Sequence, residues 1–181
     1  MRCVRFPKSF SLLGLTFLAL TSCATKQDAK LPASLTPPSD QKMILQAMGE
    51  GVQTYACEKN GDNAYTWVAQ GPVADLYDGT GNALASLVKG PRWSMKDGTA
   101  LTGVAVVASA PAPKEGEDIP WVLWKGGDAV GSGSLAHATS IRQIHTRGGL
   151  APAKGCTAEK VGKVTKVTKV TYTATYQFFA P

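Results

Sequence analysis

The sequence predicts an all-β protein, a single antiparallel β-sandwich or barrel-like domain with little helix. Three observations support this fold class. The 181 residues include 19 glycines and 11 prolines, and short β-branched or aromatic runs lie between them. Hydrophobic residues make up 44% of the chain and charged residues 18%, which argues against wholesale disorder. Beyond the N-terminal leader, no apolar run is long enough to span a bilayer as a helix.

Turns and strands alternate along the chain. Glu50 lies between two glycines and predicts a turn, and the polar segment 110–120 predicts the longest loop. Residue pairs that tolerate positive φ predict the other turns, at Asn60-Gly61, Asp78-Gly79, Gly81-Asn82, Asp97-Gly98, Gly126-Gly127 and Gly148-Gly149. The strands expected between them are residues 43–48, 52–57, 64–69, 74–77, 83–88, 101–108, 121–124, 135–146 and 164–179.

The terminal strand has the clearest alternation of side chains. Val170, Tyr172, Ala174, Tyr176 and Phe178 share one face, while threonines and a glutamine share the other, so we expect the strand to be half buried. A Lys-Val-Thr triplet repeats over residues 163–171 and specifies register only weakly. Its lysines are typical of a protected sheet edge. The alternative is a basic ladder for an anionic lipid or polysaccharide.

The N-terminus has the features of an export signal followed by a lipid anchor. Residues 1–22 combine a basic start with an apolar stretch too short for a stable membrane span, which is typical of a signal peptide. The sequence Leu20-Thr21-Ser22-Cys23 resembles the lipobox of bacterial lipoproteins, in which the cysteine receives the lipid. Cys23 is therefore the predicted lipidation site, with acyl chains such as palmitate. Ala24, in place of an Asp, favours the outer membrane, facing the periplasm or the cell surface.

Three segments follow from this organisation. Residues 1–22 form the signal peptide, residues 23–42 the lipidated cysteine and a proline-rich tether expected to be poorly packed, and residues 43–181 the β domain. Loss of the signal peptide removes three basic residues and no acidic ones, so the formal net charge falls from +6 to +3. With no basic run interleaved with aromatics, nucleic acid is not an expected partner.

The cysteines suggest one disulfide. Cys3 leaves with the signal peptide and Cys23 takes the lipid, which leaves Cys57 and Cys156 in an oxidising compartment. The alternative is two reactive thiols or a metal pair, but neither cysteine lies in a Cys-x-x-Cys spacing and no histidine is adjacent. In the chain-entropy model a disulfide that closes a loop of this size contributes about 4 kcal/mol.

No catalytic or metal-binding motif stands out. The segment 131–135 does not match the Gly-x-Ser-x-Gly nucleophile elbow. His137 and His145 would lie about 26 Å apart on a continuous strand, too far to share one metal ion, although a bulge or bend within the segment would shorten that distance. Asp75, Asp78 and Asp97 could form an acid/base pair or a calcium site, although two of them precede glycine as turn residues do. We expect no metal and no cofactor.

Aromatic residues are the better candidates for binding. Trp121 and Trp124 are three residues apart, so in a regular strand they point to opposite faces. An exposed tryptophan beside a basic residue suits a sugar ring or an apolar ligand. The candidate ligand-binding residues are Trp93, Trp121, Trp124, Arg142, His145 and Arg147.

The order of several short motifs resembles a known family, domain-of-unknown-function family 3455, over about residues 43–179. That family occurs in secreted or lipoprotein-like bacterial chains and in secreted fungal proteins, and has no established activity. The motifs that carry the resemblance are Gly51-Val52-Gln53-x-Tyr55-x-Cys57, Trp67, Gly71-Pro72-x-Ala74-x-Leu76-Tyr77-Asp78, Gly90-Pro91-x-Trp93, Asp97-Gly98-Thr99, Ile119-Pro120-Trp121, Thr146-x-Gly148-Gly149-x-Ala151-Pro152, Cys156 and Tyr172-x-Ala174-x-Tyr176.

This chain departs from the family pattern at two positions. Family members often carry a histidine where this chain has Leu87, and an arginine where it has Gln143. A function that depends on that histidine would be missing here. The resemblance implies a domain and a location, but it transfers no catalytic residue.

Two functional hypotheses follow from the sequence. The first is a non-enzymatic envelope protein, attached to the membrane through its N-terminal lipid, that binds a glycan, a small apolar ligand or an envelope protein. The second is a secreted hydrolase that acts on an envelope or extracellular polymer and uses Asp75, Asp97 or His145. The sequence leaves enzymatic activity open and favours the non-enzymatic hypothesis.

Overall fold

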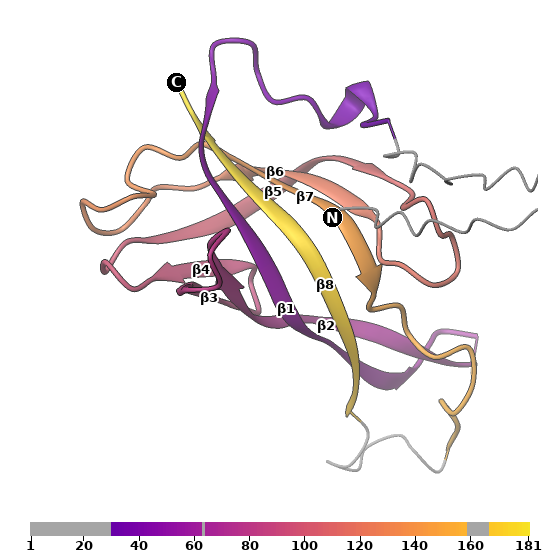
Figure 1. Ribbon diagram of the computed structural model, residues 1–181. Coiled ribbons are helices and arrows are strands. Elements are labelled where there is room, and N and C mark those ends of the chain that lie inside the picture. The colour runs from indigo at the N-terminus through magenta and orange to yellow at the C-terminus, as the bar shows by residue number, and fades with distance from the viewer. Residues whose placement is uncertain (1–29, 63, 159–166) are drawn as a thin grey trace, which may run out of the picture.

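The computed structural model describes residues 30–62, 64–158 and 167–181, and it forms a closed antiparallel barrel. Each strand pairs with the next in the chain, and the last pairs with the first (Figure 1). The barrel confirms the all-β prediction, and among the described residues the only helical element is one 3-10 turn, η1. The elements are η1 (Ala33–Leu35), β1 (Lys42–Lys59), β2 (Tyr65–Tyr77), β3 (Ala83–Val88), β4 (Arg92–Met95), β5 (Ala100–Ala110), β6 (Trp121–Gly126), β7 (Ser140–Gly148) and β8 (Val167–Ala180).

The strand β1 is continuous, so the turn predicted at Glu50 is wrong. Gly49 and Gly51, the two glycines that flank Glu50, allow close packing instead. A Cβ at Gly49 would approach the Tyr176 ring to 2.5 Å, and a Cβ at Gly51 would overlap the Val73 carbonyl oxygen of β2. Glycine is therefore required here because neighbouring strands and side chains lie too close for any other residue.

The strand β2 likewise joins two predicted strands into one. Gly71 adopts a φ of +109°, and the register between β1 and β2 shifts next to it, between Thr54 and Tyr55. This is a β-bulge, in which an extra residue bends the strand without ending it. Gly71 therefore lies at a bend within one strand and not in a turn between two strands.

The hairpin of β3 and β4 is much shorter than the strands beside it. β3 pairs only with residues 74–77 of β2, and β4 pairs only with residues 100–102 of β5. Within the described chain, residues 65–73 of β2 and 104–110 of β5 therefore have no strand paired on this side. The barrel wall is low at the short hairpin, whereas β1 and β8 run side by side over their length (Figure 1).

The barrel interior is filled by aromatic and aliphatic side chains. The predicted inward face of β8 is confirmed, because Tyr172, Ala174, Tyr176 and Phe178 are all buried. Trp93 of β4 is fully buried and packs edge-on against Tyr176 and Phe178. The β8 residues 167–171 of the Lys-Val-Thr repeat pair with β1, while residues 163–166 lie outside the described part of the chain.

A second apolar cluster lies on the outside of the barrel. Leu35 of η1 is fully buried there against Trp121, Leu123 and Ile144. Arg142 also donates a hydrogen bond of 3.1 Å to the Leu35 carbonyl oxygen. Residues 31–35 were expected to belong to a poorly packed tether, but they pack against the barrel because two leucines give this segment an apolar side.

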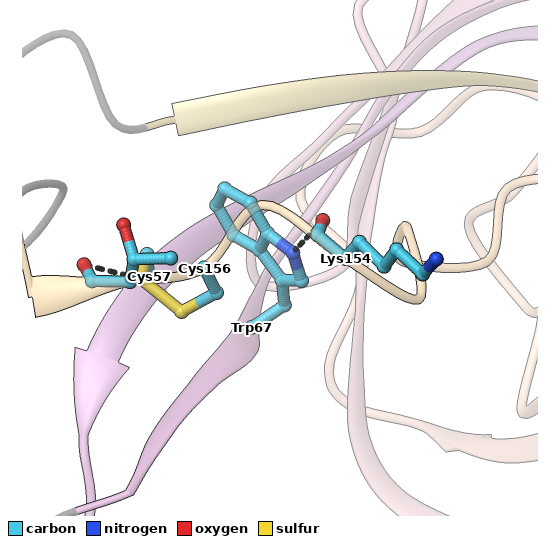
Figure 2. Close-up of a disulfide and its surroundings, with 5 residues drawn as sticks. Cys57, Trp67, Lys154 and Cys156 are labelled. Atoms are coloured by element: carbon cyan, nitrogen blue, oxygen red, sulfur yellow. Dashed lines mark hydrogen bonds between the residues drawn. A yellow bond between two sulfur atoms is a disulfide. The ribbon is translucent and has the colours of Figure 1, made fainter.

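The disulfide between Cys57 and Cys156 is confirmed, with 5.3 Å between the two Cα atoms. It links the end of β1 to the segment that follows β7 (Figure 2). Trp67 on β2 supports the same segment by donating an indole hydrogen bond of 3.3 Å to the Lys154 carbonyl oxygen.

No helix in the described residues is long and apolar enough to cross a membrane. The predicted signal peptide and Cys23 lie outside the described residues.

Candidate functional site: a cavity in the barrel mouth

A cavity of about 490 Å³ opens beside the short hairpin, where the barrel wall is low. It is lined by residues of β1 to β7, of the β3–β4 turn and of the end of the loop before β6. An eight-stranded barrel has an interior that either fills with side chains or holds one small ligand. Here the aromatic core fills one part of the interior, and the cavity occupies the part next to the low wall.

The surface of the cavity is mostly apolar. The two tryptophans that line it, Trp93 and Trp124, pack edge-on with ring centroids 5.6 Å apart. Trp93 is fully buried, and its indole Nε1 has no hydrogen-bond partner among the described residues. A buried donor without an acceptor is rare in native proteins. The other large apolar contributors are Leu87, Ile119, Pro120 and Val122.

A hydrogen-bonded chain of side chains lies at the inner end of the cavity. Gln143 lines the cavity, donates through Nε2 to the Pro120 carbonyl oxygen at 3.1 Å, and accepts through Oε1 from the Tyr176 hydroxyl at 2.9 Å. The Tyr176 hydroxyl also lies 2.9 Å from that of Tyr172. Burial raises the pKa of Tyr172 and raises that of Tyr176 well above its ordinary value, so both phenols stay neutral. This hydrogen-bonded set of side chains therefore orients Gln143 and does not supply a general base.

The rim of the cavity is polar. Lys89 donates a hydrogen bond of 3.2 Å from Nζ to Gln70 Oε1, and Gln70 in turn donates from Nε2 to Glu58 at 3.2 Å. Tyr55 points its hydroxyl at the Gly149 carbonyl oxygen, 2.7 Å away. Among the described residues that line the cavity, Lys89 is the only charged side chain, and no carboxylate is present.

The predicted tryptophan candidates fall on two sides of the barrel. Trp93 and Trp124 line the cavity, whereas Trp121 is buried on the outside in the cluster around Leu35. The odd spacing of Trp121 and Trp124 on β6 accounts for this division. Two of the three tryptophans proposed from the sequence thus lie at one site.

The predicted basic candidates do not join them. Arg142 faces outward, donates two hydrogen bonds to Gln177 at 2.7 and 2.8 Å, and lies over the Phe179 ring. His145 is exposed and packs edge-on against Trp121, with ring centroids 5.5 Å apart. Arg147 is exposed and lies 3.6 Å from the buried carboxylate of Asp118. These three residues support the outer surface and the loop before β6.

The backbone at His145 adopts an unusual conformation. Its φ of +51° is the only positive value at a non-glycine residue in the described chain. The register of β7 against β8 shifts between Ile144 and Arg147, so His145 lies in a bulge. Because the bulge interrupts the alternation of side chains, counting residues along the predicted strand 135–146 does not tell which way the His145 side chain points.

Two of the three carboxylates considered for acid/base chemistry, Asp78 and Asp97, are engaged in turns, whereas Asp75 lies exposed on β2. Asp78 accepts backbone hydrogen bonds from Thr80 at 2.8 Å and Asn82 at 2.9 Å, and Asp97 accepts them from Thr99 at 2.8 Å and Ser134 at 2.7 Å. The pKa of both carboxyls lies well below the ordinary range. For Asp78 the largest cause is the hydrogen bond that the Thr80 hydroxyl donates at 2.7 Å, and for Asp97 it is the hydrogen bond from the Ser134 backbone N–H. The turn interpretation is confirmed. Within residues 30–62, 64–158 and 167–181, no group of three or more His, Cys, Asp or Glu could hold a metal ion.

Several residues that line the cavity were not predicted from the sequence. Gln53, Tyr55, Gln70, Lys89 and Val122 were not candidates, because no spacing in the chain shows that β1, β2, the β3–β4 turn and β6 meet at one opening. A signal was nevertheless present in the family pattern. Both departures from the pattern, Leu87 and Gln143, line the cavity. The motif residues that meet there are Gln53, Tyr55, Gly71, Pro72, Gly90, Pro91, Trp93, Ile119 and Pro120.

Comparison with known proteins gives one assignment. A search of curated protein sequences and a search of solved structures each gave no match. A family model described as "Protein of unknown function (DUF3455)" matches residues 38–180, which include all eight strands of the barrel. The chain therefore belongs to the DUF3455 family of proteins of unknown function.

Proposed function

We propose that the protein is a non-enzymatic binding protein of the cell envelope, attached to the membrane by a lipid on Cys23, that takes up a small and largely apolar molecule in the mouth of the barrel. The observation that carries the proposal is the cavity of about 490 Å³ with two tryptophans in its wall. Its volume lies within the range of small-molecule sites, which are typically apolar with a few polar groups.

The composition of the cavity favours binding over catalysis. Its polar side chains are three glutamines, a serine, a tyrosine and a lysine, and no histidine, carboxylate or cysteine lines it within the described chain. The residues on which a hydrolase would depend, Asp75, Asp97 and His145, do not line the cavity. Nothing in the described residues favours the hydrolase over the binding protein.

The proposed anchor agrees with how the described chain begins. Leu31 packs against the outer cluster around Leu35, and it lies eight positions after Cys23. A chain of that length spans at most about 28 Å. A lipid on Cys23 would therefore hold the barrel close to the membrane surface, with the η1 side nearest to it.

Filling the cavity tests the binding proposal. The neutral fluorophore N-phenyl-1-naphthylamine would be titrated into the full chain carrying Cys23→Ser, which avoids detergent. Val122→Trp places a large side chain in the cavity and should weaken binding by about tenfold or more. Val107→Trp is the matched control, because Val107 is 61% exposed and does not line the cavity. Trp124→Ala provides a second cavity variant if Val122→Trp fails to fold. Equal affinity in parent and folded cavity variants would refute the proposal.

Membrane fractionation tests the anchor separately. Cys23→Ser should move the protein from the membrane to the soluble fraction, because one lipidated cysteine carries the attachment. Cys3→Ser is the control, since Cys3 lies within the predicted signal peptide and should leave attachment unchanged. Continued membrane attachment of Cys23→Ser would contradict the lipobox assignment.

A further inference from the structure

Among the described residues, the lining of the mouth cavity carries a positive charge and no negative charge. Lys89, in the turn between β3 and β4, is the only charged side chain among the described lining residues. Neither ion pair found in the described chain involves Lys89, because they join Lys114 to Glu117 and Arg147 to Asp118. A cation at the rim of an apolar cavity, with no carboxylate lining it, favours a ligand that brings the negative charge itself.

The position of Lys89 is set by packing. A Cβ placed on Gly71 would lie 3.2 to 3.4 Å from the Cα, Cβ and Cγ atoms of Lys89, so the lysine stem passes directly over this glycine of β2. Its ammonium group then reaches Gln70 Oε1 at 3.2 Å. An ammonium has three donors, and the structure shows one of them in use, which leaves capacity for a ligand oxygen.

The inner part of the cavity has the opposite character. Trp93, Trp124, Leu87 and Val122 offer aromatic and aliphatic surface, and Gln143 has its amide nitrogen and oxygen engaged by protein groups. An ionic group placed there would lose its hydration without gaining a charged partner. A ligand that fits both ends has an apolar body inside and a charged group at the rim.

We infer that the ligand is an amphipathic anion whose apolar body packs against the cavity wall that contains Trp93 and Trp124 and whose acidic group, a carboxylate or a chemical equivalent, pairs with Lys89. The inference rests on the proposed binding function, which it narrows from any small apolar molecule to organic acids. It also assigns Lys89 as the residue that discriminates an acid from the corresponding alcohol.

The test compares decanoate with 1-decanol as competitors of N-phenyl-1-naphthylamine, in the full chain carrying Cys23→Ser. Decanoate should displace the fluorophore more effectively than decanol. Lys89→Gln should weaken decanoate by about fivefold and leave decanol unchanged, as expected for loss of one partly exposed ion pair. Lys89→Arg should restore most of the decanoate affinity, and added salt should weaken decanoate alone.

Lys125→Gln is the matched control, because Lys125 is an exposed lysine on β6 that does not line the cavity. Equal displacement by acid and alcohol in parent and Lys89→Gln would overturn the inference and leave the binding function intact. A fluorophore that fails to bind the parent chain would overturn both. A loss of decanoate affinity equal in Lys125→Gln and Lys89→Gln would show a general charge effect and also overturn the assignment of Lys89.

Discussion

The two sides of the barrel differ in how completely they are paired. β1 pairs with both β2 and β8 along most of its 18 residues, and glycines there bring backbone and rings into close contact. On the other side, β3 and β4 have only 6 and 4 residues, and large parts of β2 and β5 lie beyond them. We call the side formed by β1, β2 and β8 the long wall. The long wall stabilises the barrel, whereas the short β3–β4 hairpin leaves an opening. Variants on the two sides should therefore affect different measurements.

The largest expected effect is loss of the disulfide at the end of the long wall. Replacing both Cys57 and Cys156 by alanine should lower the free energy of unfolding by about 4 kcal/mol, because the unfolded chain regains the freedom of a long loop. Urea unfolding of the variant and the oxidised parent measures the difference. An unchanged midpoint would show that this link does not stabilise the long wall.

The next effect concerns close packing within the long wall. Gly51→Ala should lower the free energy of unfolding by about 3 kcal/mol, because the added Cβ would lie 2.5 Å from Ala74 Cα and would overlap the Val73 carbonyl oxygen. Gly79→Ala is the control, since a Cβ there has no neighbour within 4 Å. Similar denaturation curves for both variants would contradict the packing argument.

The hydrogen-bonded chain below the cavity connects the two sides. Tyr176→Phe leaves Gln143 Oε1 without its donor and should lower the free energy of unfolding by about 1–3 kcal/mol. Tyr172→Phe keeps the bond from Tyr176 to Gln143 and should have the smaller effect in the same denaturation measurement. The reverse order would mean that the Tyr172 hydroxyl, and not Gln143, is the essential partner of Tyr176.

The smallest expected effect is the pH dependence of the turn after β4. The pKa of Asp97 is lowered in the folded protein, so its contribution is present above the unfolded pKa of about 4 and is lost as the pH falls below that value. Asp97→Asn should therefore flatten the dependence of stability on pH in the acid range. Asp75→Asn, on the exposed face of β2, is the control. A parent and an Asp97→Asn variant with the same acid dependence would rule out this contribution.

The sequence predicted the features that depend on local patterns. Alternation along β8 identified its buried face, and the odd spacing on β6 separated Trp121 from Trp124. The continuity of β1 could not be predicted, since Gly49 and Gly51 serve contacts with Tyr176 and β2 that are distant in the chain. The same spacing of glycines is typical of a turn.

The candidate site could be predicted only in part. Trp93 and Trp124 were found because tryptophan is a frequent binding residue, but their common cavity depends on the difference in length between β3–β4 and the neighbouring strands. Arg142 and His145 were candidates because they lie close to each other and to Arg147 in the sequence. The bulge in β7 and the docking of η1 placed them on the outer surface instead.

The tryptophans provide the most direct test of the central claim, which is that the opening at the short hairpin is a ligand site. Of the four tryptophans, Trp93 and Trp124 line the cavity, whereas Trp67 and Trp121 do not. Indole N–H resonances would be followed by NMR during titration with decanoate, and assigned with single Trp→Phe variants. The account predicts saturable shifts of the Trp93 and Trp124 signals with little change at Trp67 and Trp121. Shifts confined to Trp67 or Trp121, or no saturable shift at any tryptophan, would contradict it.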